Sequence, residues 1–135
     1  MNTPTRPSLW LSLQAYDAPA LIDFYVAAFG FTVAARYDEE DGSGRIAHAE
    51  LRWPEGTGGL MMGSHKPDGE WTTQPGGAAA YVVVADPRAL FERIQAHGGA
   101  TVIRELTEQD YGSTEFAVAD PEGNKWSFGT YPGAQ

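Results

Sequence analysis

The sequence predicts an α+β fold made of two βαβββ modules in tandem. The first observation is an internal repeat, in which residues 17–33 align without a gap with residues 86–102. The identical pairs are Asp17/Asp86, Ala20/Ala89, Leu21/Leu90, Ala27/Ala96, Gly30/Gly99, Thr32/Thr101 and Val33/Val102. The second observation is that alternating, strand-like stretches flank both copies. A repeat of this size indicates two copies of one supersecondary unit.

The length of 135 residues predicts a single domain, large enough to bury a core. We expect a first module at about 9–63, a linker at 64–77 rich in Gly and Pro, and a second module at about 78–131. Hydrophobic residues make up 42% of the chain and charged residues 20%, which is typical of globular proteins.

Composition also excludes several function classes. The net charge of -9 argues against nucleic acid, because phosphates require a basic face, and it is compatible with a cationic ligand. No apolar run approaches the roughly 18 residues of a membrane span, so no membrane partner is expected. The N-terminus has no apolar signal core and the chain has no cysteine, which together favour the cytoplasm and exclude disulfides and zinc–thiolate sites.

The first module is predicted to begin with a strand over residues 9–16, whose mixed face carries Trp10 and Gln14. Asp17 then caps a helix that ends at Gly30, since Asp accepts hydrogen bonds from free amides and Gly tolerates a left-handed turn. Further strands are expected at 31–37, 46–53 and 60–63, separated by turns at 38–44 and 54–58.

The second module repeats this order. A strand over 78–85 precedes a helix that starts with Asp86-Pro87 and ends at Gly98-Gly99. The last three strands are predicted at 100–105, 113–119 and 125–130, with a tight turn at 120–124. The helix faces expected to pack on the sheets consist of Leu21, Ile22, Tyr25 and Phe29 in the first module and Leu90, Phe91 and Ile94 in the second.

Each helix is expected to cover one face of its own sheet. The two uncovered faces would then meet and enclose a cleft, which is the default place for a ligand. Trp53 and Trp126 are interpreted as core residues under the helices.

Three segments of the chain carry a family resemblance: Asp17…Phe24-Tyr25…Phe29-Gly30-Phe31, His48-Ala49-Glu50-Leu51 and Phe116…Asp120-Pro121-Glu122-Gly123-Asn124. They resemble the glyoxalase / bleomycin-resistance / extradiol-dioxygenase superfamily, also called vicinal oxygen chelate proteins, over nearly all of residues 9–131. The resemblance implies paired βαβββ modules in a U-shaped mixed sheet around a cleft, with the helices outside and often a homodimer.

The resemblance also implies where a metal would lie. Family enzymes hold a divalent ion with His, Gln or Glu on the first and last strands of each module. The matching positions here are Trp10, Ala79, Met61 and Ser127. These side chains cannot hold a catalytic divalent ion, so we expect no metal, no cofactor and no catalytic residue of that kind.

The three histidines offer one other polar site. His48 and Glu50 lie two residues apart on a strand and point the same way, either as an edge pair or as a pair that orients a ligand. Two ligands are too few for a metal centre. His65 in the linker and His97 at a helix end are interpreted as structural or solvent-facing.

The remaining expectation is a cleft with aromatic and polar walls. The predicted ligand-binding residues are Trp10, Gln14, His48, Glu50, Met61, Tyr81, Tyr111 and Ser127, and Trp71 is expected near the mouth. Aromatic faces stack on flat or cationic groups. These features predict a metal-free protein that binds a cationic or aromatic small molecule, similar to bleomycin-type resistance proteins.

Two alternatives stay open. The first is a glyoxalase- or dioxygenase-like enzyme of unknown substrate, either metal-free or with a displaced metal site. The second is a protein that keeps only the fold, or binds a partner, with an empty cleft. Fold alone cannot choose among these, because function depends on the site. A homodimer is expected, since symmetric dimers are the commonest oligomers.

Overall fold

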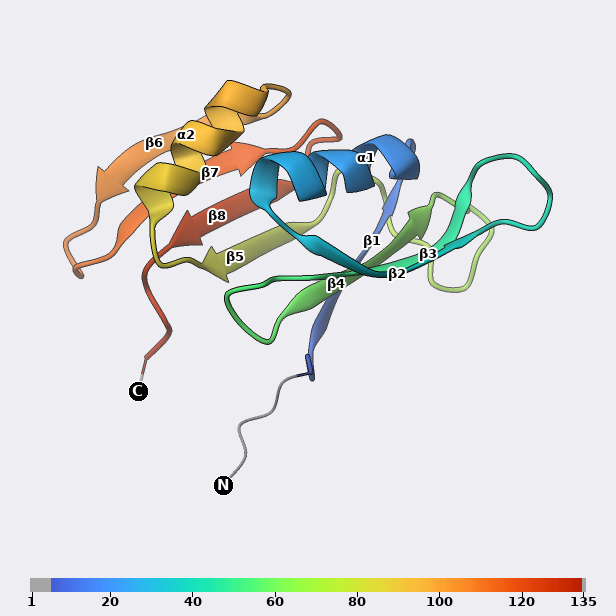
Figure 1. Ribbon diagram of the computed structural model, residues 1–135, viewed down its shortest axis with the longest axis horizontal. Coiled ribbons are helices and arrows are strands. Elements are labelled where there is room, and N and C mark those ends of the chain that lie inside the picture. The colour runs from blue at the N-terminus through green and yellow to red at the C-terminus, as the bar shows by residue number, and fades with distance from the viewer. Residues whose placement is uncertain (1–5, 135) are drawn as a thin grey trace.

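The computed structural model describes residues 6–134 and consists of two βαβββ modules joined by a long linker (Figure 1). The first module contains β1 (Trp10–Ala15), α1 (Ala18–Phe24), the π-helical turn η1 (Tyr25–Phe29), β2 (Thr32–Asp38), β3 (Ile46–Arg52) and β4 (Gly59–Ser64). The second contains β5 (Ala79–Val83), α2 (Pro87–His97), β6 (Thr101–Glu108), β7 (Thr114–Ala119) and β8 (Lys125–Gly129). The α+β class and the tandem arrangement are confirmed.

Each module forms its own four-stranded mixed sheet. The strand orders are β1-β4-β3-β2 and β5-β8-β7-β6, so the two sheets have the same topology. In both, the first strand pairs in parallel with the last, and all other pairs are antiparallel. Within residues 6–134 no ladder joins β1 to β5, so the sheets remain separate and are not closed around a cleft.

The predicted helix caps are present in both modules. The Asp17 carboxylate accepts a hydrogen bond from the Ala20 amide at 3.2 Å, and Asp86 accepts one from Ala89 at 3.1 Å. Gly30 adopts the left-handed conformation, with φ of 91°. The sequence did not indicate that the first helix ends in a π turn, in which the Gly30 amide bonds to the carbonyl five residues earlier at 3.0 Å.

One buried core spans both modules, and it is made from the helix-covered faces of both sheets. Phe29 of η1 contacts Trp126 and Phe128 of β8, with ring centroids 5.3 and 5.0 Å apart. Trp53, which directly follows β3, contacts Phe128 at 6.2 Å. The interpretation of Trp53 and Trp126 as core residues is confirmed, because only 7% and 2% of their surfaces are exposed.

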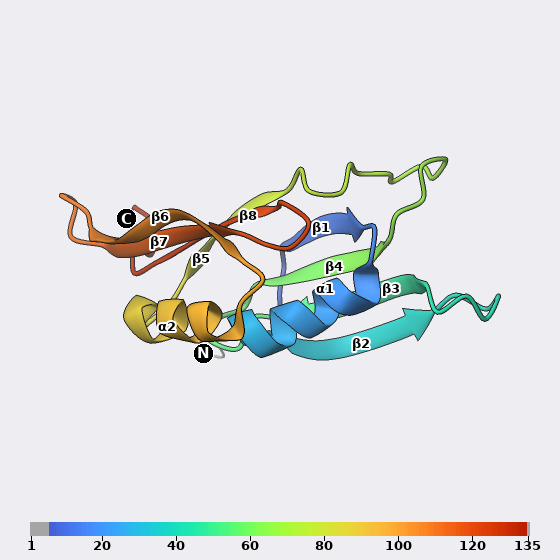
Figure 2. The same ribbon diagram turned by 90° about the horizontal axis from the view of Figure 1, so that it is seen from above.

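This shared core decides where the other two faces point. The sheets meet at an angle near β1 and β5, and both helices lie inside that angle (Figures 1 and 2). The uncovered faces therefore point away from the core. They do not meet within one chain, which corrects the expectation that they would enclose a cleft. We refer to them below as the outer faces of the first and second sheets.

The turn at residues 120–124 fastens the two modules together. The buried Asp120 carboxylate accepts hydrogen bonds from the Tyr25 hydroxyl at 2.5 Å and from the Trp126 indole at 3.0 Å. Glu122 accepts hydrogen bonds from the amides of Tyr16 and Asp17 at 2.7 and 2.8 Å. The turn at residues 120–124 thus connects the first helix to the second sheet through hydrogen bonds.

Two details differ from the alternation expected in the first sheet. The strand expected from residue 9 begins at Trp10, and Leu9 before it has 83% of its surface exposed. Ile46 is fully buried although it alternates with the buried Ala49, because the β2–β3 ladder changes register next to the hairpin. Among the helices of residues 6–134, none is long and apolar enough to cross a bilayer.

Candidate functional site

A mostly apolar cleft opens between the edge strands β1 and β5, where the two sheets approach each other; we call it the seam cleft. Its volume is about 500 Å³. Residues that line it come from both modules and include Leu9, Trp10, Leu11, Phe31, Trp53, Glu55, Leu60, Tyr81, Val83 and Trp126. Ligand sites of drug-sized molecules fall in this range of volume and are lined mainly by apolar and aromatic side chains.

Trp10 lies at this cleft because the neighbouring strand provides a glycine. Gly59 of β4 pairs with Trp10 in the parallel ladder. A Cβ atom at Gly59 would come within 2.7 Å of the Trp10 ring and 2.6 Å of the Leu51 carbonyl oxygen, closer than real Cβ atoms approach. The glycine thus has a packing role besides marking the turn before β4.

A second hollow, on the outer face of the second sheet, surrounds a buried carboxylate; we call it the Glu115 hollow. Its volume is about 590 Å³, and it is lined by Tyr81, Arg104, Tyr111, Glu115, Ser127 and Tyr131. Tyr81 also lines the seam cleft, so the two hollows adjoin at one side chain.

Three hydroxyl groups hold the Glu115 carboxylate. Tyr111 donates to Oε1 at 2.5 Å, and Tyr81 and Ser113 donate to Oε2 at 2.7 and 3.1 Å. The Tyr81 hydroxyl in turn accepts a hydrogen bond from the Tyr131 amide at 3.1 Å. Only 2% of the surface of Glu115 is exposed, so this arrangement fixes the carboxylate in one position.

These contacts shift the acidity of all three groups. Burial by itself would raise the pKa of Glu115, but the hydrogen bonds from Tyr111, Tyr81 and Ser113 bring it below the ordinary value of 4.5. The hydrogen bond to Glu115 raises the pKa of Tyr111 to about 12, and burial followed by the same acceptor raises the pKa of Tyr81. At neutral pH the site therefore holds one carboxylate and two neutral phenols.

The expected His48–Glu50 pair forms, but it lies on the outer face of the first sheet. His48 Nε2 is 2.9 Å from Glu50 Oε2, and the ring of Tyr37 stacks near His48 at 6.5 Å. Met61 lies next to Glu50 across the β3–β4 ladder. None of His48, Glu50 and Met61 lines the seam cleft or the Glu115 hollow.

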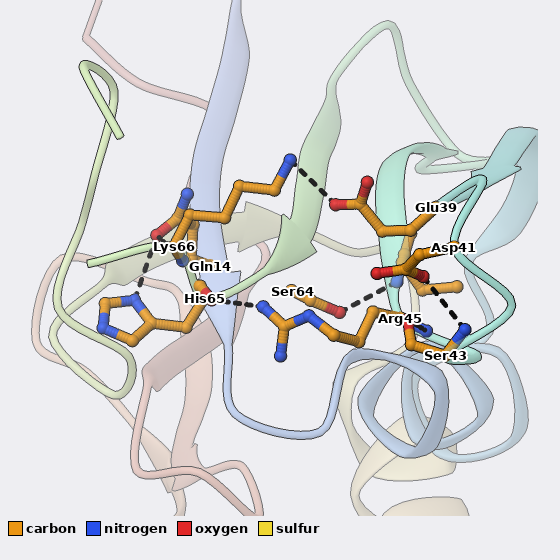
Figure 3. A network of polar contacts seen from close by, with 9 residues as sticks. Gln14, Glu39, Asp41, Ser43, Arg45, Ser64, His65 and Lys66 are labelled. Carbon is orange, nitrogen blue, oxygen red and sulfur yellow. Dashed lines mark hydrogen bonds and ion pairs between the residues drawn. The ribbon is translucent and has the colours of Figure 1, made fainter. Parts of the chain in front are cut away.

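Gln14 has a structural partner in the linker instead of a free side chain. Its Oε1 accepts a hydrogen bond from the Lys66 amide at 3.2 Å and lies 3.0 Å from His65 Nδ1 (Figure 3). Lys66 continues the network through an ion pair with Glu39 at 2.8 Å. Gln14 thus fastens the linker to β1, and Lys66 fastens it to the β2–β3 hairpin, away from both hollows.

The structure therefore brings together only some of the predicted site residues. Trp10 and Tyr81 meet at the seam cleft, and Tyr81, Tyr111 and Ser127 meet at the Glu115 hollow. Trp71, expected near the mouth, lines neither and is 85% exposed.

Sequence reasoning missed Glu115, Arg104 and Tyr131. Glu115 lies two residues from Ala117, which pairs with Ser127 in the β7–β8 ladder. The period of two along a strand could have placed Glu115 on the same face as Ser127. Arg104 and Tyr131 carried no comparable signal, because one follows a change of register in β6 and the other lies beyond β8.

No metal centre emerges from the described residues. Among residues 6–134, no three His, Cys, Asp or Glu side chains gather where they could hold an ion. The positions that hold metal in the resembled family are occupied by Trp10 in β1, Ala79 in β5, Met61 in β4 and Ser127 in β8. These residue types do not fit a divalent metal.

The two βαβββ modules and their seam define the class of protein. A sequence model of the glyoxalase/bleomycin resistance protein/dioxygenase superfamily matches residues 9–128, and the chain belongs to this superfamily. An uncharacterized protein of Mycobacterium bovis, Mb0911c, is 35% identical, and the match covers 96% of this chain and 86% of the relative. Rv0887c of Mycobacterium tuberculosis, also uncharacterized, is 35% identical over 96% of this chain and 77% of its own length.

Solved structures share the fold. TioX from a Micromonospora species superimposes with a TM-score of 0.72 and 27% identity, over 90% of this chain and 95% of TioX. TnmS3 from a Streptomyces species, described as an antibiotic binding protein, gives a TM-score of 0.70 and 19% identity over 95% and 96% of the two chains.

Proposed function

We propose that this chain is a metal-free binding protein that sequesters a flat aromatic small molecule, in the manner of bleomycin-type resistance proteins. The observation that carries this proposal is the seam cleft. Its volume suits a drug-sized molecule, and the rings of Trp10 and Tyr81 offer faces on which a planar ring system can stack.

Charge favours a cationic ligand over an anionic one. The chain carries 18 acidic against 9 basic residues, and Glu55 lies at the wall of the seam cleft. An acidic protein attracts cations by its long-range field and repels anions.

The fold is compatible with such a role. TnmS3 is an antibiotic binding protein with the same fold. Because its identity to this chain is only 19%, that likeness concerns the fold, and the proposal for this chain depends on its own lining residues.

We further propose that the working form is a homodimer. The outer faces of both sheets are left without a helix, and they carry exposed apolar side chains such as Tyr37, Tyr81 and Val83. If the outer face of one copy's first sheet covers the outer face of its partner's second sheet, two equivalent clefts form by symmetry. Such pairing would give the enclosed cleft that a single chain lacks.

Calorimetric titration with a panel of planar, positively charged antibiotics tests the binding function. We expect saturable binding of at least one compound, about 10-fold weakened by Trp10→Ala, because one lost stacking partner contributes about 1.4 kcal/mol. Trp71→Ala is the matched control, since Trp71 is 85% exposed and lies outside the cleft. The proposal is wrong if no compound binds, or if both variants weaken binding equally while remaining folded.

The enzyme alternative depends on the His48–Glu50 pair, in which an imidazole contacts a carboxylate on an outer face. If this pair belonged to a displaced metal site, protein purified without chelator would carry stoichiometric metal. His48→Ala would then remove the metal. We expect no stoichiometric metal, because two ligands hold a divalent ion too weakly.

A further inference from the structure

We propose that the Glu115 hollow is a recognition site for an alkylammonium group, which makes it the cationic end of the ligand site. The inference rests on the proposed function in one respect, namely that the same ligand places its flat part in the seam cleft. The class of ligand is then an aromatic compound that carries a quaternary or protonated amine.

The first argument is the charge state of Glu115. The carboxylate is buried, and its three hydrogen-bond donors are all neutral hydroxyl groups. Among the described residues, no Lys, Arg or His side chain lies within ion-pair distance of it. A buried carboxylate without an ion-pair partner in contact is costly, so a cation that reaches Glu115 gains an electrostatic attraction, which the more distant charge of Arg104 partly offsets.

The second argument is the ring of phenols around the carboxylate. Tyr81, Tyr111 and Tyr131 all line the hollow. The rings of Tyr111 and Tyr131 are 5.5 Å apart and inclined at 71°, which is an edge-to-face pair at the rim of the carboxylate site. Alkylammonium groups bind where aromatic rings form such a cage, because the ring quadrupole attracts the cation.

The third argument is connection to the seam cleft. Tyr81 lines both hollows, and its hydroxyl is fixed between Glu115 and the Tyr131 amide. One ligand can therefore pass along the Tyr81 ring with its flat part beside Trp10 and its amine beside Glu115.

Arg104 allows a test of whether the hollow prefers a cation or an anion. It lines the same hollow and helps to keep the pKa of Glu115 low, yet it forms no ion pair with Glu115 among the described residues. Its charge opposes a cationic ligand. Replacement of Arg104 by Gln should therefore strengthen the binding of an ammonium compound, whereas an anion-binding hollow would respond in the opposite direction.

Choline and its uncharged isostere 3,3-dimethyl-1-butanol separate charge from shape. Titration of the full-length protein, followed by NMR or calorimetry, is expected to show at least about 10-fold tighter binding of choline. Glu115→Gln should remove this preference, because the amide keeps a hydrogen-bond acceptor but loses the charge. Arg104→Gln should increase choline affinity by a few fold. Asp110→Asn, which removes an exposed carboxylate from the same turn region, should change nothing.

The outcomes distinguish this inference from the proposed function. Equal binding of the two isosteres, or choline binding that survives Glu115→Gln in a variant shown to be folded by its thermal unfolding, would overturn the ammonium site. If uncharged 2-naphthol still binds and depends on Trp10, the binding function stands without the ammonium site. If 2-naphthol, choline and the antibiotic panel all fail to bind, both proposals are wrong.

Discussion

Asp120 shows how a single side chain joins the two modules. Its Oδ2 accepts hydrogen bonds from the Tyr25 hydroxyl, the Trp126 indole and the Asn124 amide, and its Oδ1 accepts backbone amides of the turn. Both oxygens thus face donors only, which is the arrangement that a carboxylate satisfies and a carboxamide cannot.

Asp120→Asn should therefore lower the free energy of unfolding by about 2–4 kcal/mol, because its amide hydrogens would face other donors in a buried site. Urea denaturation measures the change, and Asp110→Asn on an exposed turn is the matched control. If the two variants lose the same stability, Asp120 does not hold the modules together.

In the proposed ammonium site, Glu115 would make ligand binding depend on pH in a defined direction. Its pKa in the folded protein lies below the ordinary 4.5, so the carboxylate stays charged down to lower pH than a free glutamate. Because the folded-state pKa is lowered, the stabilisation from this charge is present above the ordinary pKa and is lost as the pH falls through the folded-state value.

We accordingly expect choline affinity to stay constant from about pH 8 to about pH 5 and to fall only below 4.5. Titrations at successive pH values, with Glu115→Gln as the reference, measure this dependence. A loss of affinity near pH 6.5, the usual range of histidine, would instead assign the cation site to a residue other than Glu115.

At the scale of elements, β8 shows why a strand position requires glycine. A Cβ atom on Gly129 would come within 2.5 Å of Glu115 Cγ and also collide with the Tyr81 hydroxyl. The absence of a side chain at the end of this strand therefore allows the Tyr81–Glu115 hydrogen bond to form.

Gly129→Ala should cost about 1–3 kcal/mol of stability and displace Tyr81 from Glu115. Gly58→Ala is the control, since no atom lies within 4 Å of the added methyl group and its backbone is not left-handed. Thermal unfolding and the tyrosine side-chain NMR signals report the two effects. An unchanged Tyr81 signal in Gly129→Ala would show that the Tyr81–Glu115 hydrogen bond does not require glycine at this position.

The elements were predicted well from the sequence because their signals are local. Asp17 and Asp86 cap the helices as expected, since capping depends only on neighbouring amides. The π turn at the end of the first helix was not predicted; its last residue, Phe29, packs on Phe128 of the other module, a contact that local sequence signals do not report. Of the residues that line the Glu115 hollow, Tyr81, Tyr111 and Ser127 were predicted. Arg104 and Tyr131 were not, because their positions depend on the strand register of β6 and on the path of the chain after β8.

For the whole molecule, the angle between the two sheets could not be predicted from sequence patterns. Alternation shows that each strand has an apolar face, but it does not show whether the helix-covered faces or the uncovered faces of two sheets meet. Here Trp53 and Phe128 join the helix-covered faces in one core. The cleft expected between the uncovered faces is therefore not present within one chain.

If a second copy supplies the missing wall, the protein should be a dimer in solution. Light scattering coupled to gel filtration should then give about twice the chain mass of 14.6 kDa. Tyr37→Asp, on the exposed outer face of the first sheet, should shift the equilibrium towards monomer by burying a charge in the interface. A wild-type mass of one chain, independent of concentration, would contradict the dimer.

We propose above all that this chain binds a small molecule without a metal. Calorimetric titration of the best-binding antibiotic, with protein treated with EDTA and with protein supplied with excess divalent metal, tests it most directly. We expect the same affinity and a chemically unchanged ligand in both titrations. Binding that requires the metal, or conversion of the ligand during the titration, would contradict it.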